Sequence, residues 1–143
     1  MLKKHITIQN VSWQTHAQAL SALREAVFIQ EQQVPIALEW DGLDETAQHL
    51  LALNDAGEPI GCARLLGDGT IGRMVVLKPW RQQGVGMALL RQAIALYRQL
   101  GIHNITLSAQ MHAIKFYEKA GFIVCSEPYL DAGIKHVDMR LLG

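Results

Sequence analysis

Apolar residues along the chain recur with a period of two in some segments and with the helical period in others. Short or alternating apolar runs predict seven strands, at residues 5–9, 48–53, 59–66, 70–77, 104–108, 122–125 and 134–141. Helical spacing predicts helices over about residues 17–30, 85–100 and 112–120. Residues 74–77 are apolar throughout, which is typical of a strand covered on both faces.

The ends of these helices carry recognisable signals. Ser12 or Thr15 can cap the first helix, and Pro35 prevents its continuation. Gly101 follows the longest helix at the position where a left-handed residue commonly ends one. One apolar stripe marks the buried face of that helix: Val85, Leu89, Ala93, Leu96 and Leu100.

The element order and the absence of repeats or linkers predict a single domain over residues 1–143. Strands paired as hairpins occupy the first half, and a strand-helix-strand unit follows. We therefore expect a three-layer α/β (α+β) domain, with a mixed central sheet of about seven strands flanked by helices.

Charge is balanced overall but segregated along the chain. The 13 basic and 13 acidic residues give zero net charge, which argues against a nucleic-acid or polybasic membrane partner. Residues 1–68 nevertheless sum to −5, and residues 69–117 hold six basic residues and no acid. This asymmetry predicts an anion-binding region in the second segment.

The N-terminus and the cysteines favour a cytoplasmic protein. Residues 1–6 lack the apolar stretch of a signal peptide. Cys62 and Cys125 match no metal spacing, so we expect both to be buried and inert, and we expect no metal.

The loop Arg81-Gln82-Gln83-Gly84-Val85-Gly86 lies between an apolar strand and the longest helix. Free N–H groups and the positive end of the helix dipole favour phosphate there, and glycines let the backbone approach it. Arg81 adds charge-assisted donors. The spacing fits neither a Walker A loop nor the dinucleotide fingerprint, and a plain strand-to-helix turn is the alternative.

The pattern Arg81-x-x-Gly84-x-Gly86 after the strand over 70–77 resembles motif A of the GNAT acyltransferases (GCN5-related N-acetyltransferases). The run Phe116-Tyr117-Glu118-Lys119-Ala120-Gly121-Phe122 resembles motif B of the same family. A narrower resemblance, to the ElaA/YjcF-like branch, rests on residues 27–35, 72–76 and Ala109-Gln110-x-His112. The resemblance covers nearly the full chain and implies the GNAT acyl-CoA N-acyltransferase fold.

The resemblance implies that the loop binds the pyrophosphate of acetyl-CoA, and that Tyr117 is the general acid that protonates the coenzyme A thiolate. It places Gln110 where many relatives carry Asn, beside the pantetheine arm. A strand N–H near Val75 or Val76 would polarise the thioester carbonyl. The implied coenzyme-binding residues are Met74, Val75, Val76, Leu77, Arg81, Gln82, Gln83, Gly84, Val85, Gly86, Met87, Gln110, Phe116 and Tyr117.

The general base is left open. Many relatives place a glutamate on the strand before the loop, but residues 70–77 contain no acid and Arg73 occupies that strand. Glu31, Asp41 and His112 are the candidates. The alternative for Glu31 is a place on a solvated helix face, and the alternative for His112 is a helix-capping or partly exposed histidine. A free amine could also arrive neutral and need no strong base.

The acidic stretch 39–45 is a candidate acceptor side, because its charge would attract an amine and Trp40 could add a cation–π contact. A solvated acidic loop is the alternative. The expected acceptor-side residues are Glu31, Trp40, Asp41 and Arg73.

These observations predict an N-acetyltransferase that moves an acetyl group from acetyl-CoA to a primary amine of a small molecule or peptide. The expected mechanism is direct attack in a ternary complex. A non-catalytic acyl-CoA sensor on the same fold is the alternative, and a different nucleotide-binding α/β protein is a third hypothesis. A homodimer is a further expectation, because dimers are common among relatives of this family.

Overall fold

The computed structural model describes residues 5–142, apart from the side chains of residues 37 and 38, so residues 1–4 of the signal-peptide prediction lie outside it. The strands are β1 (Thr7–Val11), β2 (Gln48–Leu53), β3 (Pro59–Leu65), β4 (Thr70–Val76), β5 (Thr106–Gln110), β6 (Phe122–Val124), β7 (Tyr129–Asp131) and β8 (Ile134–Leu141). The helices are α1 (Trp13–Arg24), α2 (Ile36–Glu39), α3 (Val85–Gln99) and α4 (Ile114–Glu118). A π-helix η1 (Glu25–Glu31) extends α1, and 3-10 turns η2 (Lys78–Trp80) and η3 (Met111–Ala113) precede α3 and α4.

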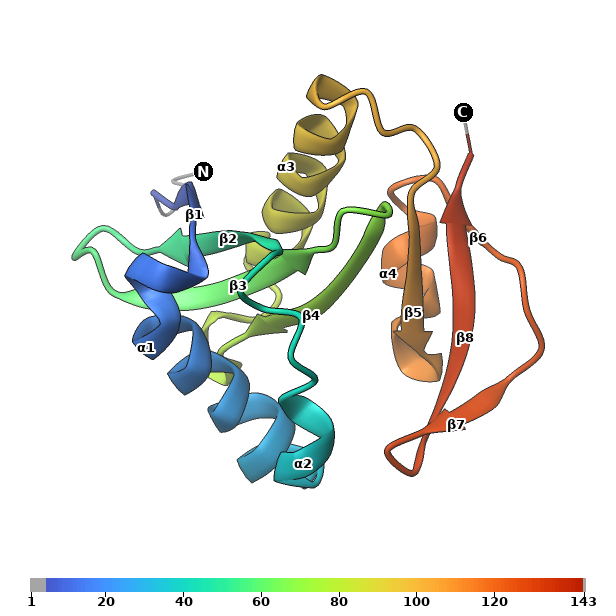
Figure 1. The fold of residues 1–143 in the computed structure, drawn as a ribbon, viewed down its shortest axis with the longest axis horizontal. Helices are drawn as coiled ribbons and strands as arrows, with labels where there is room; N and C mark the ends of the chain where they lie inside the picture. Colours follow the sequence, from blue (N-terminus) through green and yellow to red (C-terminus); the bar gives the residue numbers. More distant parts are fainter. Residues whose placement is uncertain (1–4, 143) are drawn as a thin grey trace.

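The sheet consists of two halves that diverge at its centre. Its strand order is β1-β2-β3-β4-β5-β8-β6, with β7 paired to β8. All pairs are antiparallel except β4 with β5, which match only at Thr70–Thr106 and Ile71–Leu107. Beyond these residues β4 and β5 separate, and Figure 1 shows β4 running across the molecule while β5 turns away from it. Beyond Ile71 and Leu107, the facing edges of β4 and β5 are therefore no longer paired with each other, and the sheet is split between them.

A β-bulge in β4 accompanies this divergence. Cys62 and Arg64 of β3 pair with Val75 and Gly72 of β4, so β4 holds one extra residue between the two pairs. Arg73 lies in this bulge with a positive φ of 48°. Bulges bend and twist the strand that carries them, which accounts for β4 leaving β5 after so short a contact.

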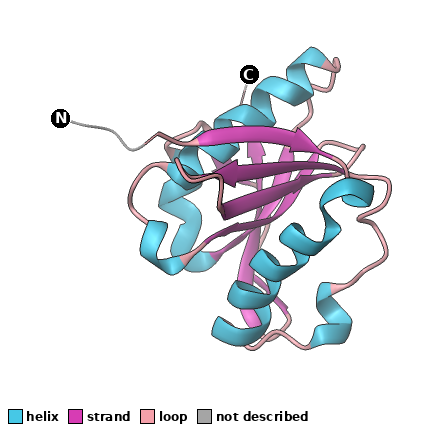
Figure 2. Ribbon diagram, turned by 90° about the vertical axis from the view of Figure 1, so that its left-hand side faces the viewer, coloured by secondary structure: helices cyan, strands magenta, loops and turns pink. Residues whose placement is uncertain are grey.

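Helices cover both faces of the sheet, as Figure 2 shows. Alternate residues of β2 serve the two faces: Leu50 and Ala52 pack in the cluster around α3, whereas Leu51 packs with Leu20 and Leu23 of α1. The period-two pattern of β2 therefore builds two cores. This mixed sheet between helical layers confirms the predicted fold class.

Most predicted elements are confirmed, with three corrections. The sheet has eight strands, because the short β7 forms an additional hairpin with β8. The first helix starts at Trp13, where Ser12 Oγ accepts the Thr15 N–H at 3.3 Å, and its last turns are the π-helix η1. The acidic stretch, expected to be irregular, begins with α2.

Candidate functional site

The loop before α3 exposes the backbone of the first helical turn. Gly84 is the N-cap residue, with φ of 87°, and has no side chain to cover the helix end. The Ala88 N–H donates to the Gly84 carbonyl at 3.0 Å, so the N–H groups of residues 85–87 precede the first intrahelical bond. The structure thus places an N-terminal helix dipole where the sequence predicts an anion site.

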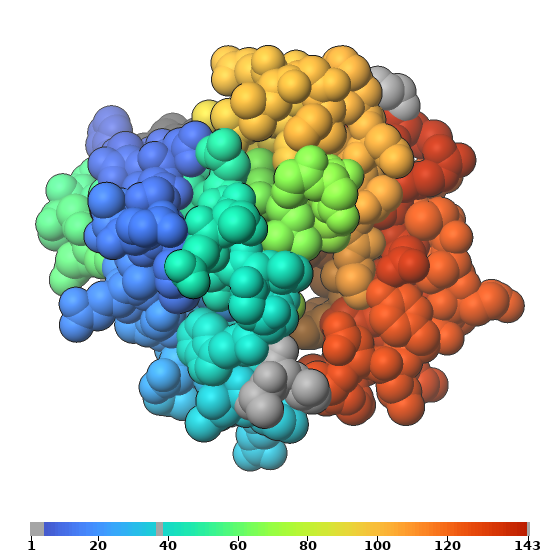
Figure 3. Space-filling view, in the orientation of Figure 1, coloured from blue at the N-terminus to red at the C-terminus, as the bar shows by residue number. Residues whose placement is uncertain are grey.

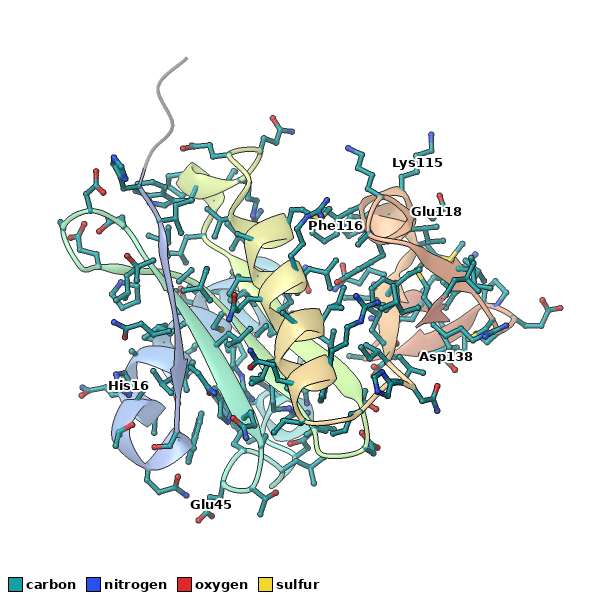
Figure 4. All side chains as sticks on the ribbon, turned by 90° about the horizontal axis from the view of Figure 1, so that it is seen from above. His16, Glu45, Lys115, Phe116, Glu118 and Asp138 are labelled. Atoms are coloured by element: carbon teal, nitrogen blue, oxygen red, sulfur yellow. The ribbon has the colours of Figure 1, made fainter. Side chains whose placement is uncertain are left out.

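Gly86 brings α4 close to the start of α3. A Cβ atom at this position would lie 3.2 Å from Cζ of Phe116, so only glycine allows this packing without displacement. Figure 4 shows Phe116 on the side of α4 nearer α3, with Lys115 and Glu118 on its outer side. The two resemblance motifs are therefore in direct contact.

A cleft of about 650 Å³, here called the α3 cleft, lies along this contact. It is lined by the end of β4, the loop, the start of α3 and α4. Three basic residues line it, Arg81, Arg91 and Lys119, and no acidic residue of the described chain does. The cleft therefore favours an anionic ligand.

A second cleft of about 490 Å³, here called the α1 cleft, opens on the other face of the sheet. Phe28 of η1, Gln32 just after it, His112 of η3 and His136 of β8 line it. In the space-filling view the surface is hollowed between the teal segment that leads into β2 and the orange β7–β8 hairpin (Figure 3). The two clefts share six residues, namely Met74, Val75, Val76, Arg81, Ala113 and Tyr117. Ligands in the two clefts would thus meet beside β4 and Tyr117.

Tyr117 is partly buried at this junction. Its ring makes edge-to-face contacts with Phe116 and Phe122, at centroid distances of 5.0 and 6.2 Å. Burial raises the pKa of Tyr117 to about 12, so the phenol keeps its proton throughout the neutral range. Tyr117 is therefore equipped to donate a proton or a hydrogen bond.

Arg81 and Glu31 form a two-fold ion pair at the rim shared by the clefts. The guanidinium donates to both carboxylate oxygens of Glu31 at 2.8 Å, and its Nε donates to the Val76 carbonyl at 2.9 Å. Hydrogen bonding from Arg81 lowers the pKa of Glu31. Glu31, predicted as a candidate base, is thereby made a weaker proton acceptor.

Six charged side chains form an ion network between α1, α2 and the sheet. Arg24 is 1% exposed and donates to Glu39 and Asp44, both at 2.7 Å. Arg64 holds both oxygens of Asp41 at 2.8 Å and reaches Asp44 at 3.2 Å. Arg73 of the bulge lies 3.2 Å from Glu39 and 3.1 Å from Asp41. We call these residues the arginine network: Arg24, Glu39, Asp41, Asp44, Arg64 and Arg73.

The arginine network corrects the interpretation of the acidic stretch. Glu39, Asp41 and Asp44 are neutralised by three arginines, so most of the charge expected to attract an amine is engaged inside the protein. The bonds from Arg64 lower the pKa of Asp41 to about 2, which makes it a poor base. Asp41 and Arg73 still line a smaller cavity next to the α1 cleft, with Gln110 and His136.

Three further predictions need correction. Trp40 lies over the Arg24 guanidinium at 4.9 Å and, among the residues described, lines neither the α1 nor the α3 cleft, so its ring face serves the arginine network. Cys125 is exposed because β6 ends at Val124, whereas Cys62 is buried as expected, with a thiol pKa raised by burial to about 12. Leu77 donates its N–H to Ile60 of β3, so it has no free amide for a coenzyme.

The remaining predicted residues divide by where they lie. Met74, Val75, Val76, Arg81, Gln82, Gly84, Gly86, Met87, Phe116 and Tyr117 line the α3 cleft. Val85 is buried in the core and can offer a ligand only its backbone, whereas Gln83 is exposed and donates one side-chain N–H to the Pro79 carbonyl. His112 and Gln110 line the α1 cleft, where the Gln110 amide is paired with Gln32 at 2.9 Å.

Several residues of the α1 cleft were not predicted from the sequence, among them Gln32 and His136. Gln32 follows η1, whose widened turns could not be foreseen from apolar spacing. His136 lies in a correctly predicted strand, but only the pairing of that strand with β5 brings it to the cleft. A signal was present, because Val137 continues the apolar face of the strand and leaves His136 on the other face.

Two kinds of feature are absent from the described part of the chain. Residues 5–142 contain no cluster of three or more His, Cys, Asp or Glu side chains that could hold a metal ion. No helix in this range is long and apolar enough to cross a membrane.

Comparison with known proteins identifies the family. The model of the acetyltransferase (GNAT) domain matches residues 12–142. The protein named uncharacterized N-acetyltransferase YjcF, from Bacillus subtilis, is 37% identical over 121 residues, which cover 82% of this chain and 86% of that protein. The Escherichia coli ElaA structure has a TM-score of 0.86 and 29% sequence identity, and the match covers 96% of this chain and 100% of ElaA. A Pseudomonas aeruginosa acyl-CoA N-acyltransferase has a TM-score of 0.81 and 33% identity, over 98% and 100% of the two chains. The chain therefore belongs to the GNAT acetyltransferase family, in its ElaA/YjcF-like branch.

Proposed function

We propose that the protein transfers an acetyl group from acetyl-CoA to a primary amine of a small-molecule or peptide acceptor, by direct attack within a ternary complex. One observation carries the proposal: the α3 and α1 clefts open on opposite faces of the sheet and share Val76 and Tyr117. A donor in one cleft and an acceptor in the other would react at this junction. Holding two reactants in line supplies much of the acceleration in such reactions.

The α3 cleft suits the coenzyme. The N–H groups at the start of α3 and the three basic side chains would bind its phosphates. The separation of β4 from β5 leaves a strand edge along which an extended, amide-containing arm could pair. Glycines at 84 and 86 keep that surface clear of side chains.

The edge of β4 also offers a donor for the thioester oxygen. Leu77 directs its N–H to β3, and neighbouring residues of a strand point their backbone groups to opposite edges. Val76 therefore presents its N–H to the open edge, where its carbonyl already accepts the Arg81 bond. An N–H fixed in this way stabilises the negative charge that develops on the carbonyl oxygen.

Tyr117 would assist departure of the sulfur. Its raised pKa keeps the phenol protonated, so the proton is available when negative charge develops on the sulfur. Tyr117 therefore acts first as a hydrogen-bond donor to the sulfur and gives up its proton as the C–S bond breaks.

Ligand-induced thermal stabilisation and release of free thiol test the proposal together. Acetyl-CoA should raise the melting temperature by mass action, whereas ATP and NAD at equal concentration should not. Thiol release should then rise with at least one member of a panel of polyamines, aminoglycosides, amino acids and peptides. No stabilisation by acetyl-CoA would overturn the proposal, and stabilisation without turnover on any amine would favour a binding role instead.

The proposal also includes turnover without a metal, a homodimer and a cytoplasmic location. Activity should survive treatment with EDTA, and light scattering after size-exclusion chromatography should give about twice the chain mass of 15.9 kDa. Fractionation of cells should recover the protein with cytoplasmic markers.

A further inference from the structure

We infer that His136 is the general base that takes a proton from the attacking amine, an inference that rests on the function proposed above. His136 lies on β8, directly opposite Gln110 of β5 on one side and Tyr129 of β7 on the other. It lines both the α1 cleft and the smaller cavity beside it.

The hydrogen bond at Nδ1 fixes the protonation pattern of the ring. Nδ1 lies 2.7 Å from the Ile134 carbonyl, and a carbonyl oxygen can only accept, so the proton must be on Nδ1. In the neutral ring Nε2 then carries a lone pair and no proton. A histidine held in this tautomer can accept a proton at Nε2 and pass none to the carbonyl.

The hairpin partner holds the ring in place. Tyr129 stacks on His136 with the ring centroids 6.1 Å apart and the planes 22° apart. The Tyr129 hydroxyl donates to Asp138 at 2.6 Å and contacts Ser108, so the stacking ring is itself fixed. His136 is 9% exposed, and its strand is paired with β5 on one side and β7 on the other, so the ring is oriented before any ligand binds.

The neighbouring groups leave His136 as the best base in the α1 cleft. Four acids line the cleft or the smaller cavity: Glu31, Glu39, Asp41 and Asp131. The first three are in ion pairs with arginines, and Asp131 is exposed in the β7–β8 hairpin. The other titratable or charged groups there are Arg64, Arg73, Arg81, His112 and Tyr117. Three are cations and Tyr117 is a protonated phenol, so only His112 competes, and it is exposed on η3.

The proposed step balances as follows. The amine nitrogen forms a bond to the acetyl carbon, the C–S bond breaks, and the electron pair stays on sulfur. One N–H proton passes to His136 Nε2, and the sulfur takes the Tyr117 proton. Exchange through solvent returns the proton from the imidazolium to the Tyr117 oxygen.

Two amines of the same skeleton separate a base from a structural histidine. The probes are ethylamine and the weakly basic 2,2,2-trifluoroethylamine, assayed by thiol release from acetyl-CoA. His136→Gln should lose about 100-fold in kcat/KM with ethylamine. The loss should be smaller for trifluoroethylamine, because its nitrogen is more acidic once bonded to the acetyl carbon and needs less help from a base. Trifluoroethylamine does not ionise in the neutral range, so with this amine the acidic limb of the pH profile should vanish in the variant. His103→Gln, at an exposed loop histidine, is the matched control and should match the wild type.

Equal losses for both amines with an unchanged pH profile would overturn the inference, as would loss of the acidic limb in His112→Gln instead. His136→Asn guards against a misfolded first variant, and its melting temperature should stay near that of the wild type.

A readout without turnover separates this inference from the proposed function. Long-range proton–nitrogen NMR of the wild type should show His136 with its proton on Nδ1 and a bare Nε2. A proton on Nε2 would overturn the inference whatever the activity, whereas absence of acetyl-CoA binding would overturn the proposed function alone.

Discussion

Two sets of arginine–carboxylate pairs lie on the same side of the sheet, and burial separates their roles. The arginine network holds Arg24 and Glu39 almost fully out of solvent, at 1% and 3% side-chain exposure. The Arg81–Glu31 pair is almost as short, at 2.8 Å against 2.7 Å for Arg24–Glu39, but its side chains are 36% and 41% exposed. A buried charge cannot lose its partner without a large desolvation cost, whereas an exposed pair opens easily. The same chemistry thus fixes the fold in one place and leaves an exchangeable contact in the other.

The largest expected effect follows from breaking the arginine network at its most buried member. Arg24→Met leaves Glu39 and Asp44 without their shortest partner, so the free energy of unfolding should fall by about 3–5 kcal/mol. Urea denaturation measures this loss. Arg98→Met, on the exposed side of α3, is the control and should change stability by less than about 0.5 kcal/mol. Equal losses of stability in the two variants would show that the buried arginine network contributes no more to the fold than an exposed arginine does.

The stability that Asp41 contributes through the arginine network should depend on pH. Its pKa falls from 3.8 in the unfolded chain to about 2, so the stability it contributes is present above pH 4 and is lost as the pH falls towards 2. The contribution is about 2 kcal/mol at neutral pH. Burial raises the pKa of Glu39 and so acts in the opposite sense, and comparison with Asp41→Asn isolates Asp41.

Chemical denaturation of the wild type and of Asp41→Asn at pH 7 and at pH 2 measures how much charged Asp41 contributes to the free energy of unfolding. The two proteins should differ by about 2 kcal/mol at pH 7 and by much less at pH 2. A difference that stays constant between these pH values would contradict the assigned role of Arg64 as the partner of charged Asp41.

The exposed pair should matter for the coenzyme more than for the fold. Arg81→Gln should change the free energy of unfolding by less than about 1 kcal/mol. Its affinity for acetyl-CoA should nevertheless fall about 10-fold, because a charge-assisted bond to a phosphate or carbonyl is lost. Isothermal titration measures the affinity, and an unchanged value would show that Arg81 serves only Glu31.

Glu31→Gln gives the smallest effect. It should leave stability within about 1 kcal/mol of the wild type and should not weaken acetyl-CoA binding, since Arg81 is freed from its partner. A marked loss of turnover with normal coenzyme affinity would instead restore Glu31 as a candidate base.

The contrast also explains which features of the site can be predicted from the sequence and which cannot. The proposed anion site consists of consecutive residues, Gly84–Gly86 after a strand, so local spacing is enough to predict the helix start on which it depends. The arginine network joins α1, β3 and β4 to one loop, and nothing in the acidic stretch alone indicates that its partners are buried arginines. His136 reaches the α1 cleft only through the β5–β8 register, which a single sequence does not specify. Contiguous features were predictable, and those made by strand pairing were not.

The most direct test of the account compares acetyl transfer by wild type and Tyr117→Phe at saturating acetyl-CoA, with the same amine. Tyr117 lies where the two clefts meet, so the account predicts coenzyme affinity within a few-fold of the wild type and turnover lower by about 100-fold or more. Unchanged turnover would contradict the assignment of Tyr117 as the proton donor at the junction of the two clefts.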